Sequence, residues 1–272
     1  MTQKQTGRRC IKMPTGKFRE EWRVGRGLSP LSVAGSGIRQ PYFNKVLSLF
    51  GSSLIGYWPM DEAVGATVAV DYSGQSNNGA YTATVLGQPG IGDGRTCPLL
   101  DGTAGFNNIY SAALNTDFNN QTGMLAAWIK VANIGVWTDG TTRRVATIRV
   151  DSNNFVFINR TTTNNQFSAG YVAGGTNKQV VYTPGTTVGD AWFHVAIVWN
   201  KPGDAVNTFF NGVQSGTQTG LGVWGAGGLA ATFTVIGASV TTPLNVWSGY
   251  IAHVVLTNNA ESISAMKELS VI

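Results

Sequence analysis

The carboxylates beyond residue 50 are the residues of this chain that come closest to a catalytic set. Acid–base hydrolysis of a glycosidic bond requires two of them roughly 5–9 Å apart, one with a raised pKa. The only glutamates in this region are Glu62, Glu261 and Glu268. Asp61 and Glu62 are adjacent, so their side chains would point to opposite faces of a strand. We therefore interpret them as turn or edge residues and predict that the protein is not an enzyme, with a hydrolase as the least favoured alternative.

Histidine and cysteine offer little further chemistry. His194 and His253 each lie in an apolar run. This favours structural imidazoles bonded to a neighbouring strand or loop over a catalytic or metal-binding role. Cys10 and Cys97 are far apart in the sequence and do not form a disulfide framework. We interpret them as buried or free thiols, and a bridge from Cys10 to Cys97 or between subunits stays open.

Aspartates near turns could offer oxygen ligands to calcium. The ion requires six to eight oxygens, usually including several carboxylates. Asp71 precedes a Ser-Gly pair, which is typical of a residue that caps a turn. We therefore predict neither a metal site nor a cofactor. The aspartates considered are Asp61, Asp71, Asp93 and Asp101.

Three tryptophans are candidates for carbohydrate binding. Trp137, Trp224 and Trp247 each follow a valine and lie beside Gly, Thr or Ser, a context typical of loops. Exposed rings in such loops could stack on pyranose rings. The favoured alternative is that they close the ends of the core or contact another subunit.

Charge is distributed unevenly along the chain. Ten of the 19 Lys and Arg residues fall in the first fifty positions, against only Glu20 and Glu21, a formal charge of +8. The other 222 residues carry 9 basic and 12 acidic side chains, a formal −3. Such a basic, weakly patterned segment is typical of a tail or of an anchor that orders against a partner. We favour an anchor. Nucleic acid is not an expected partner, because only this segment could neutralise phosphates.

Apolar side chains are interspersed in the basic segment, as a docking peptide requires, since screened charge alone gives little affinity. We predict a partner-binding arm over residues 1–50 and a domain over residues 51–272. A second basic cluster is interpreted as a solvated rim or as an aid to docking on an acidic surface: Arg143, Arg144, Arg149 and Arg160. The arm residues expected to bind the partner are Arg8, Arg9, Lys12, Lys17, Phe18, Arg19, Trp22, Arg23 and Leu28.

Short apolar runs and turn signals alternate from residue 54 onward, which predicts an all-β sandwich or jelly roll. Only residues 43–50 and 262–269 have helical spacing, with Ser262 as the expected N-cap. Strands and helices do not alternate, so a parallel α/β sheet is not expected. The expected strands cover residues 54–58, 124–131, 145–150, 154–159, 166–172, 179–182, 192–200, 206–210, 232–237 and 249–256.

Several motifs occur in an order that resembles one family. Residues 54–62 (LIGYWPMDE) and 71–81 (DYSGQSNNGAY) are similar to the opening of laminin-G-like, concanavalin A-like jelly rolls. Residues 192–199 (WFHVAIVW) and 209–216 (FFNGVQSG) resemble its W-x-H-V-A strand and N-G hairpin, and residues 247–255 (WSGYIAHVV) its closing strand. The resemblance implies two antiparallel sheets packed face to face, with first and last strands close together. The sequence lacks the E-x-D-x-x-E motif of the family's glucanases.

Domains of this kind behind a short N-terminal segment resemble those of phage and prophage virion proteins. We therefore predict a non-enzymatic virion structural protein, a capsid decoration or a tail-associated component, localised to the virion. Its expected partners are other virion proteins, bound through residues 1–50, and a homo-oligomer stays open. The alternative is a carbohydrate-binding module that mediates adhesion to glycans. The sequence predicts neither a signal peptide nor a membrane span.

Overall fold

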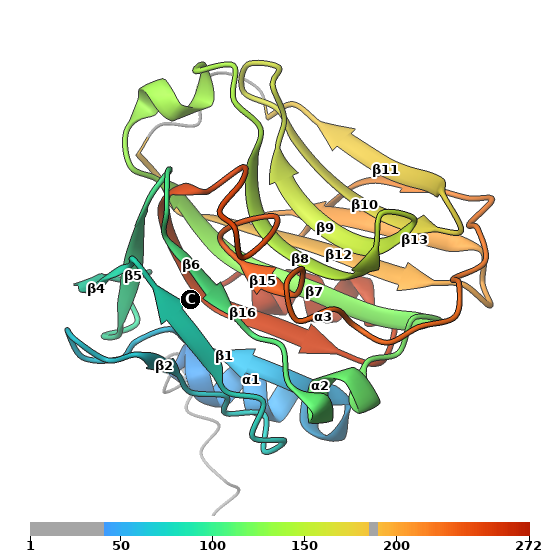
Figure 1. Ribbon diagram of the computed structural model, residues 1–272, viewed down its shortest axis with the longest axis horizontal. Coiled ribbons are helices and arrows are strands. Elements are labelled where there is room, and N and C mark those ends of the chain that lie inside the picture. Colours follow the sequence, from blue (N-terminus) through green and yellow to red (C-terminus); the bar gives the residue numbers. More distant parts are fainter. Residues whose placement is uncertain (1–40, 185–189) are drawn as a thin grey trace, which may run out of the picture. The chain divides into compact units, whose positions relative to one another are not determined.

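The computed structural model describes residues 41–184 and 190–272. These residues form two antiparallel sheets that pack face to face as a jelly-roll sandwich, with few helices (Figure 1). No helix of the described part is both long and apolar enough to cross a membrane. The predicted fold class is therefore confirmed.

One sheet, here called sheet A, contains the first and last strands side by side. In spatial order it holds β14 (Val213–Gln218), β13 (Ala205–Phe210), β12 (Phe193–Asn200), β7 (Thr122–Val131), β16 (Ser248–Thr257), β5 (Thr96–Asp101) and β4 (Val85–Pro89). The opening strand β1 (Leu54–Trp58) pairs with β16. The expected closeness of the first and last strands is thus confirmed.

The second sheet, sheet B, packs on one face of sheet A. In spatial order it holds β11 (Thr176–Tyr182), β10 (Phe167–Ala173), β9 (Asn154–Arg160), β8 (Arg143–Asp151), β15 (Val235–Ile236), β6 (Phe106–Asn108), β3 (Gly79–Thr82) and β2 (Val68–Ala69). The run at 232–237 forms only the two-residue β15, and the short strands β2 to β6 were not predicted.

The helices are short. They are α1 (Tyr42–Phe50), α2 (Ala112–Asp117) and α3 (Ile263–Leu269), with single 3-10 turns at η1 (Gly51–Ser53) and η2 (Ile134–Trp137). As predicted, Ser262 caps α3, because its hydroxyl accepts a hydrogen bond from the backbone N–H of Ala265 at 3.2 Å. Such a cap satisfies one of the amides that a helix start leaves unpaired.

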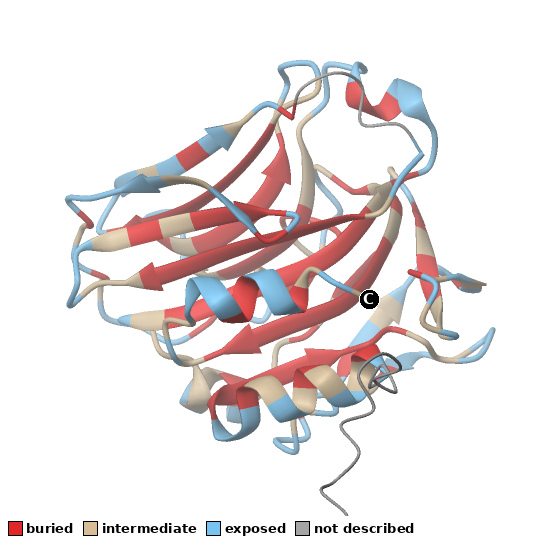
Figure 2. Ribbon diagram, turned by 180° about the vertical axis from the view of Figure 1, so that it is seen from behind, coloured by how far each residue is buried: buried red, intermediate tan, exposed pale blue. Residues whose placement is uncertain are grey.

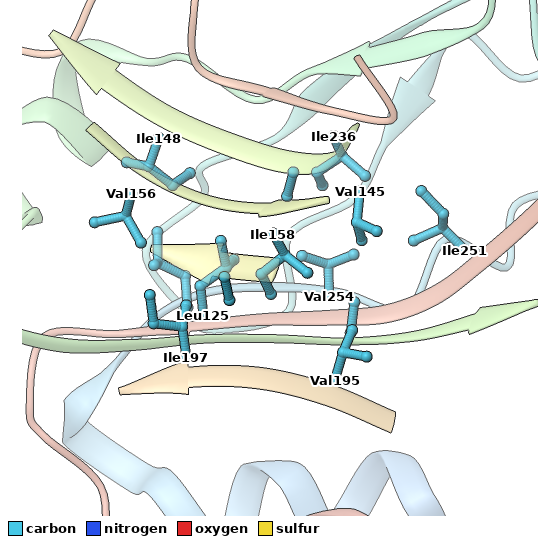
Figure 3. Close-up of a cluster of buried hydrophobic side chains, with 14 of the residues drawn as sticks. Leu125, Val145, Ile148, Val156, Ile158, Val195, Ile197, Ile236, Ile251 and Val254 are labelled. Carbon is cyan, nitrogen blue, oxygen red and sulfur yellow. The ribbon is translucent and has the colours of Figure 1, made fainter. Parts of the chain in front are cut away.

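Alternation along the strands produces two separate apolar layers. On β12, Val195 and Ile197 point between the sheets, together with Ile158 of β9 and Val254 of β16 (Figure 3). Their neighbours Ala196 and the other even-numbered residues point to the opposite face of sheet A. A central strand with two apolar faces requires a cover on each side.

Helices α1 and α3 supply that second cover (Figure 2). Tyr42, Val46 and Phe50 repeat every four residues on α1 and are all buried against sheet A. The Tyr42 hydroxyl donates a 2.7 Å hydrogen bond to the carbonyl of Leu269 at the end of α3. The compact unit therefore includes residues 39–272, and its boundary lies before α1 rather than after residue 50.

The hairpin between β13 and β14 illustrates how one turn fixes register. Asn211 and Gly212 have φ values of 48° and 74°. A type I′ turn requires positive φ at both central positions, which only Gly, Asn and Asp adopt readily. The Asn-Gly pair thus specifies this turn directly from the sequence.

Candidate ligand-binding surfaces

The residues predicted to form the anchoring arm lie outside the described residues. These are Arg8, Arg9, Lys12, Lys17, Phe18, Arg19, Trp22, Arg23 and Leu28. Their role as partner contacts stays a prediction.

The three tryptophans considered for glycan stacking are buried. Trp137, Trp224 and Trp247 have exposed fractions of 1%, 7% and 0% and belong to the core between the sheets. Trp137 contacts Phe167 edge-on at 5.1 Å between ring centres, and Trp224 lies 5.4 Å from Tyr171. These side chains close the core, as the favoured alternative predicted, and their faces are not available to a sugar.

The carboxylates near the start of the domain organise backbone and turns. Glu62 accepts hydrogen bonds from the Val70 amide and the Tyr81 hydroxyl, both at 2.6 Å. Asp61 forms an ion pair with Arg95. Asp71 accepts from three backbone amides, including those of Tyr57 at 2.8 Å and Asn77 at 2.8 Å, and so caps its turn as predicted. Each of these carboxylates has structural partners, as turn and edge residues do.

The two histidines are both buried, each with an exposed fraction of 1%. His253 sits at a bulge of β16 with φ of 49°, and its Nδ1 lies 2.8 Å from the Tyr57 hydroxyl. Its Nε2 lies 3.0 Å from Asp93. His194 has no partner at Nδ1, and complete burial lowers its pKa to about 3. Within the described ranges, no group of three His, Cys, Asp or Glu side chains is placed to hold a metal ion.

A row of half-buried side chains crosses the face of sheet A that α1 and α3 cover in part. Tyr250 of β16 lies opposite Lys130 of β7. His194 lies opposite Trp128 in the pairing of β12 with β7, so Trp192, two residues before His194, reaches the level of Lys130. We call Trp192, Lys130 and Tyr250 the aromatic row.

The two rings of the aromatic row converge over the strand between them. Their centres are 6.2 Å apart at an angle of 56°. Their strands are two strand spacings apart, about 9.6 Å, so the rings lean toward each other across β7. The ammonium of Lys130 lies 5.4 Å from the centre of the Tyr250 ring. The row is thus a preformed cluster on paired strands.

The apolar surface continues from the aromatic row toward the sheet edge. Leu99 of β5 lies opposite Tyr250, and Val85 of β4 lies opposite Leu99. Leu99 is half-buried, and 55% of Val85 is exposed. Sequence reasoning placed Trp192 on an apolar strand face and so missed its exposure.

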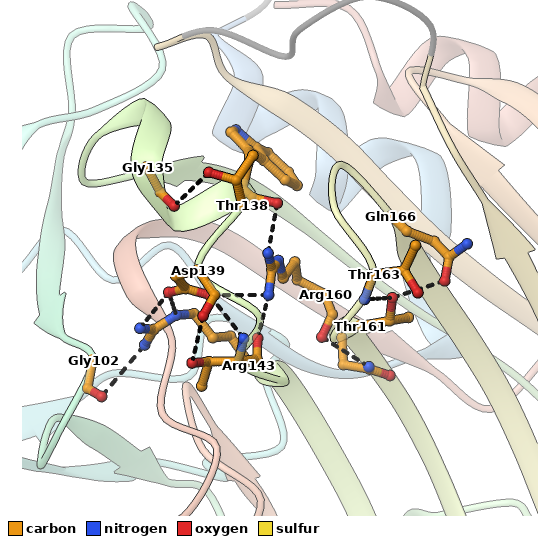
Figure 4. A network of polar contacts seen from close by, with 12 residues as sticks. Gly102, Gly135, Thr138, Asp139, Arg143, Arg160, Thr161, Thr163 and Gln166 are labelled. Atoms are coloured by element: carbon orange, nitrogen blue, oxygen red, sulfur yellow. Dashed lines mark hydrogen bonds and ion pairs between the residues drawn. The ribbon is translucent and has the colours of Figure 1, made fainter.

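The second basic cluster separates into two pairs. Arg143 and Arg160 both contact Asp139, at 2.7 and 3.0 Å (Figure 4). The side chain of Arg160 is fully buried, so the interpretation of the whole cluster as a solvated rim is corrected. Arg144 and Arg149 instead lie on the outer face of sheet B, above phenyl rings.

The fold defines the chain as a lectin-like jelly-roll domain. The sequence model described as the Concanavalin A-like lectin/glucanases superfamily matches residues 102–263, which is more than half of the chain. The chain therefore belongs to this family, as its motifs indicated. A search of curated proteins found no match.

Solved structures with the same fold include carbohydrate-bound domains. The ligand-binding domain of botulinum neurotoxin serotype D, in complex with N-acetylneuraminic acid, is 13% identical with a TM-score of 0.62, over 83% of this chain and 52% of that one. Domain 4 of AbnA, a GH43 extracellular arabinanase from Geobacillus stearothermophilus, in complex with arabinotriose, is 16% identical with a TM-score of 0.56, over 80% and 98%. Trypanosoma rangeli sialidase, in complex with the inhibitor DANA, is 11% identical with a TM-score of 0.56, over 80% and 32%.

At these identities the likeness shows the fold alone. The chain spans about half the length of the toxin binding domains that it matches. The AbnA domain, in contrast, is matched over nearly its full length.

Proposed function

We propose that the protein is a non-enzymatic carbohydrate-binding domain whose ligand contacts the aromatic row. The observation that carries this proposal is the convergence of Trp192 and Tyr250 over Lys130 on the outer face of sheet A. Aromatic rings offer large apolar faces at low conformational-entropy cost, together with a polar tip. A sugar ring presents the complementary pattern, an apolar C–H face with hydroxyls at its edge.

The polar tips of the aromatic row are available to sugar hydroxyls. Among the described residues, the indole N–H of Trp192, the ammonium of Lys130 and the phenol of Tyr250 have no hydrogen-bond partner. The indole and ammonium groups donate, and the phenol both donates and accepts. Because Lys130 and Tyr250 stand on hydrogen-bonded strands and Trp192 directly precedes β12, binding requires little ordering of the protein.

The oligosaccharide complex of the AbnA domain supports a carbohydrate ligand for this chain, since that domain is matched over 98% of its length. The carboxylates of Asp61, Glu62 and Asp71 are engaged in structural contacts, which supports binding without hydrolysis.

The test is a glycan array followed by calorimetric titration of the strongest hit. We expect Trp192→Ala and Tyr250→Ala each to weaken binding about tenfold or more, the effect of a central aromatic contact. Tyr72→Ala is the matched control, because 42% of this tyrosine is exposed and it lies on the turn after Asp71, outside the aromatic row. A silent array, or unchanged binding by both row variants, contradicts the proposal.

We further propose that this domain is displayed on a virion and attached through its basic N-terminal segment. The support is the charge asymmetry: residues 1–38 hold 8 of the 19 basic and 2 of the 14 acidic side chains, which leaves 11 and 12 in residues 39–272. A segment with a formal +6 is suited to charge-assisted contacts with an acidic protein surface.

Attachment is tested by mixing the purified protein with particles that lack it. A form that begins at residue 39 should not sediment with the particles, whereas the full chain should. The matched control is Lys267→Gln, which removes one exposed positive charge from the domain. Equal sedimentation of the full and shortened chains would refute attachment through this segment and leave carbohydrate binding untouched.

A further inference from the structure

The outer face of sheet B carries two arginines above phenyl rings. In the pairing of β8 with β9, Thr147 lies opposite Phe157 and Arg149 opposite Phe155. The guanidinium carbon of Arg144 is 4.5 Å from the centre of the Phe157 ring. That of Arg149 is 5.4 Å from the Phe155 ring and 4.3 Å from the Phe233 ring. We call Arg144, Arg149, Thr147 and Phe155 the arginine face.

The arginines of this face are held in place by the sheet. Arg144 and Arg149 share one side of β8, because Ile148 and Val145 point into the core between the sheets. The rings of Phe155 and Phe157 are 5.5 Å apart. Arg144 and Arg149 thus lie over neighbouring rings of one pair, and Nε of Arg149 donates a 2.8 Å hydrogen bond to the carbonyl of Asp151.

The polar atoms of the arginine face are incompletely paired. Nε and Nη1 of Arg144 are buried without a hydrogen-bond partner, and so is the hydroxyl of Thr147, whose exposed fraction is 1%. Burial, with the nearby positive charge of Arg149, lowers the pKa of Arg144 to about 10. Arg143 and Arg160 share Asp139, but Arg144 contacts no carboxylate in the described part of the chain. A buried charge without a counter-ion is costly unless a ligand supplies one.

The charge balance limits the kind of anion. From residue 39 onward the chain has 11 basic and 12 acidic side chains, so a long polyanion meets no net positive field there. A single carboxylate needs only the two guanidiniums, whose planar forks match its geometry. Phe155 is only half-buried and offers an apolar edge to the group that carries the carboxylate.

We propose that the arginine face binds the carboxylate of an acidic saccharide, a uronate or a sialate, with Arg144 and Arg149 as the carboxylate-binding residues. The inference rests on the proposed function only in taking a saccharide as the ligand. The site itself is on the opposite sheet from the aromatic row, so one can exist without the other.

The experiment is a calorimetric titration of the full chain with glucuronate and N-acetylneuraminate, and with glucose, N-acetylmannosamine and inorganic phosphate for comparison. We expect the two acidic sugars to bind about tenfold or more tightly than their neutral counterparts, because only the acidic sugars offer a carboxylate to the two guanidiniums. Arg144→Gln and Arg149→Gln should each weaken binding of the acidic sugars about tenfold or more, since each removes charge-assisted hydrogen bonds. Arg144→Lys should bind at an intermediate level, because it keeps the charge and loses the fork.

One control variant isolates the site. Lys267→Gln removes one exposed charge from α3, away from the arginine face, and should bind glucuronate as the unaltered protein does. Thermal unfolding of each arginine variant, and the side-chain Nε–H signals of arginine in a nitrogen–proton correlation spectrum, separate loss of binding from loss of fold. A folded Arg149→Gln variant with full affinity overturns the proposal.

The remaining outcomes are equally distinct. Phosphate binding as tight as glucuronate binding overturns the saccharide assignment and leaves an anion site. A positive array for neutral glycans with no uronate binding overturns this inference alone. If Arg144→Gln abolishes uronate binding while the aromatic row binds no glycan, the result supports the carboxylate site on the arginine face. It then removes only the proposed role of the aromatic row.

Discussion

Trp247 and Trp192 show what local sequence does and does not determine about a single side chain. Trp247 has the neighbours of a loop residue, yet it is fully buried and packs against Phe167. Trp192 begins an apolar strand, yet it is partly exposed. Local pattern gives the face on which a side chain lies. Exposure depends instead on how far distant elements cover that face, which the local pattern does not contain.

Because Trp247 is a core residue, its truncation should affect stability rather than binding alone. We expect Trp247→Ala to lower the free energy of unfolding by about 3–5 kcal/mol, the usual cost of emptying such a site. Trp192→Ala should cost less than about 1 kcal/mol. Urea unfolding monitored by circular dichroism measures both. Equal stability of the two variants would show that the indole of Trp247 is not part of the core.

His194 gives the domain a specific response to acid. Its pKa is about 3 when folded and about 6.5 when unfolded, so between these values the unfolded chain binds the extra proton. Stability is fully present above about pH 6.5 and is lost as pH falls toward 3, by about 1.4 kcal/mol for each unit of pKa difference. His194→Phe, which suits the contact with Trp128, should reduce the slope of melting temperature against pH between 4 and 6.5. An unchanged slope would assign this acid sensitivity to other groups.

At the scale of elements, helices and long strands follow from spacing, whereas short strands do not. The runs at 124–131 and 192–200 have enough apolar residues to be assigned, and β7 and β12 occupy them. Strands of two residues, such as β2 and β15, are too short to show the two-residue alternation of side chains by which a strand is recognised. Their conformation is imposed by the neighbours to which they pair, β3 in one case and β6 and β8 in the other.

The helix α1 belongs to the domain because of one stripe of side chains. Val46→Asp places a charge at the centre of that stripe, and we expect a loss of about 3 kcal/mol or more, as for an unpaired buried charge. Asn44→Asp, on the exposed side of the same helix, should change stability by less than about 0.5 kcal/mol. Chemical denaturation of the two variants measures both changes in the free energy of unfolding. Equal stabilities would mean that α1 contributes little to the folded domain.

At the scale of the molecule, the sequence separates a basic segment from a nearly neutral domain. The described residues belong to the domain, so the structure accounts for its fold. The jelly roll and its long strands could be predicted, because alternation and turn residues encode them. The aromatic row and the arginine face could not, since each joins residues from strands that are distant in the sequence: Trp192 with Tyr250, and Arg149 with Phe233.

This separation predicts that folding and attachment respond differently to salt. The core side chains of the described residues begin at Tyr42, and the compact unit begins at residue 39, so a form that begins at residue 39 should melt within about 2 °C of the full chain. The full chain has a formal charge of +5, whereas the form that begins at residue 39 has a formal charge of −1. Attachment of the full chain to particles should weaken steeply between about 50 and 500 mM NaCl, because contacts between exposed charges are screened within about 10 Å at 0.1 M salt. Melting temperature should hardly change over that range, since apolar burial is not screened. Attachment that survives high salt would require that apolar residues of the segment, rather than its charge, hold the domain on the particle.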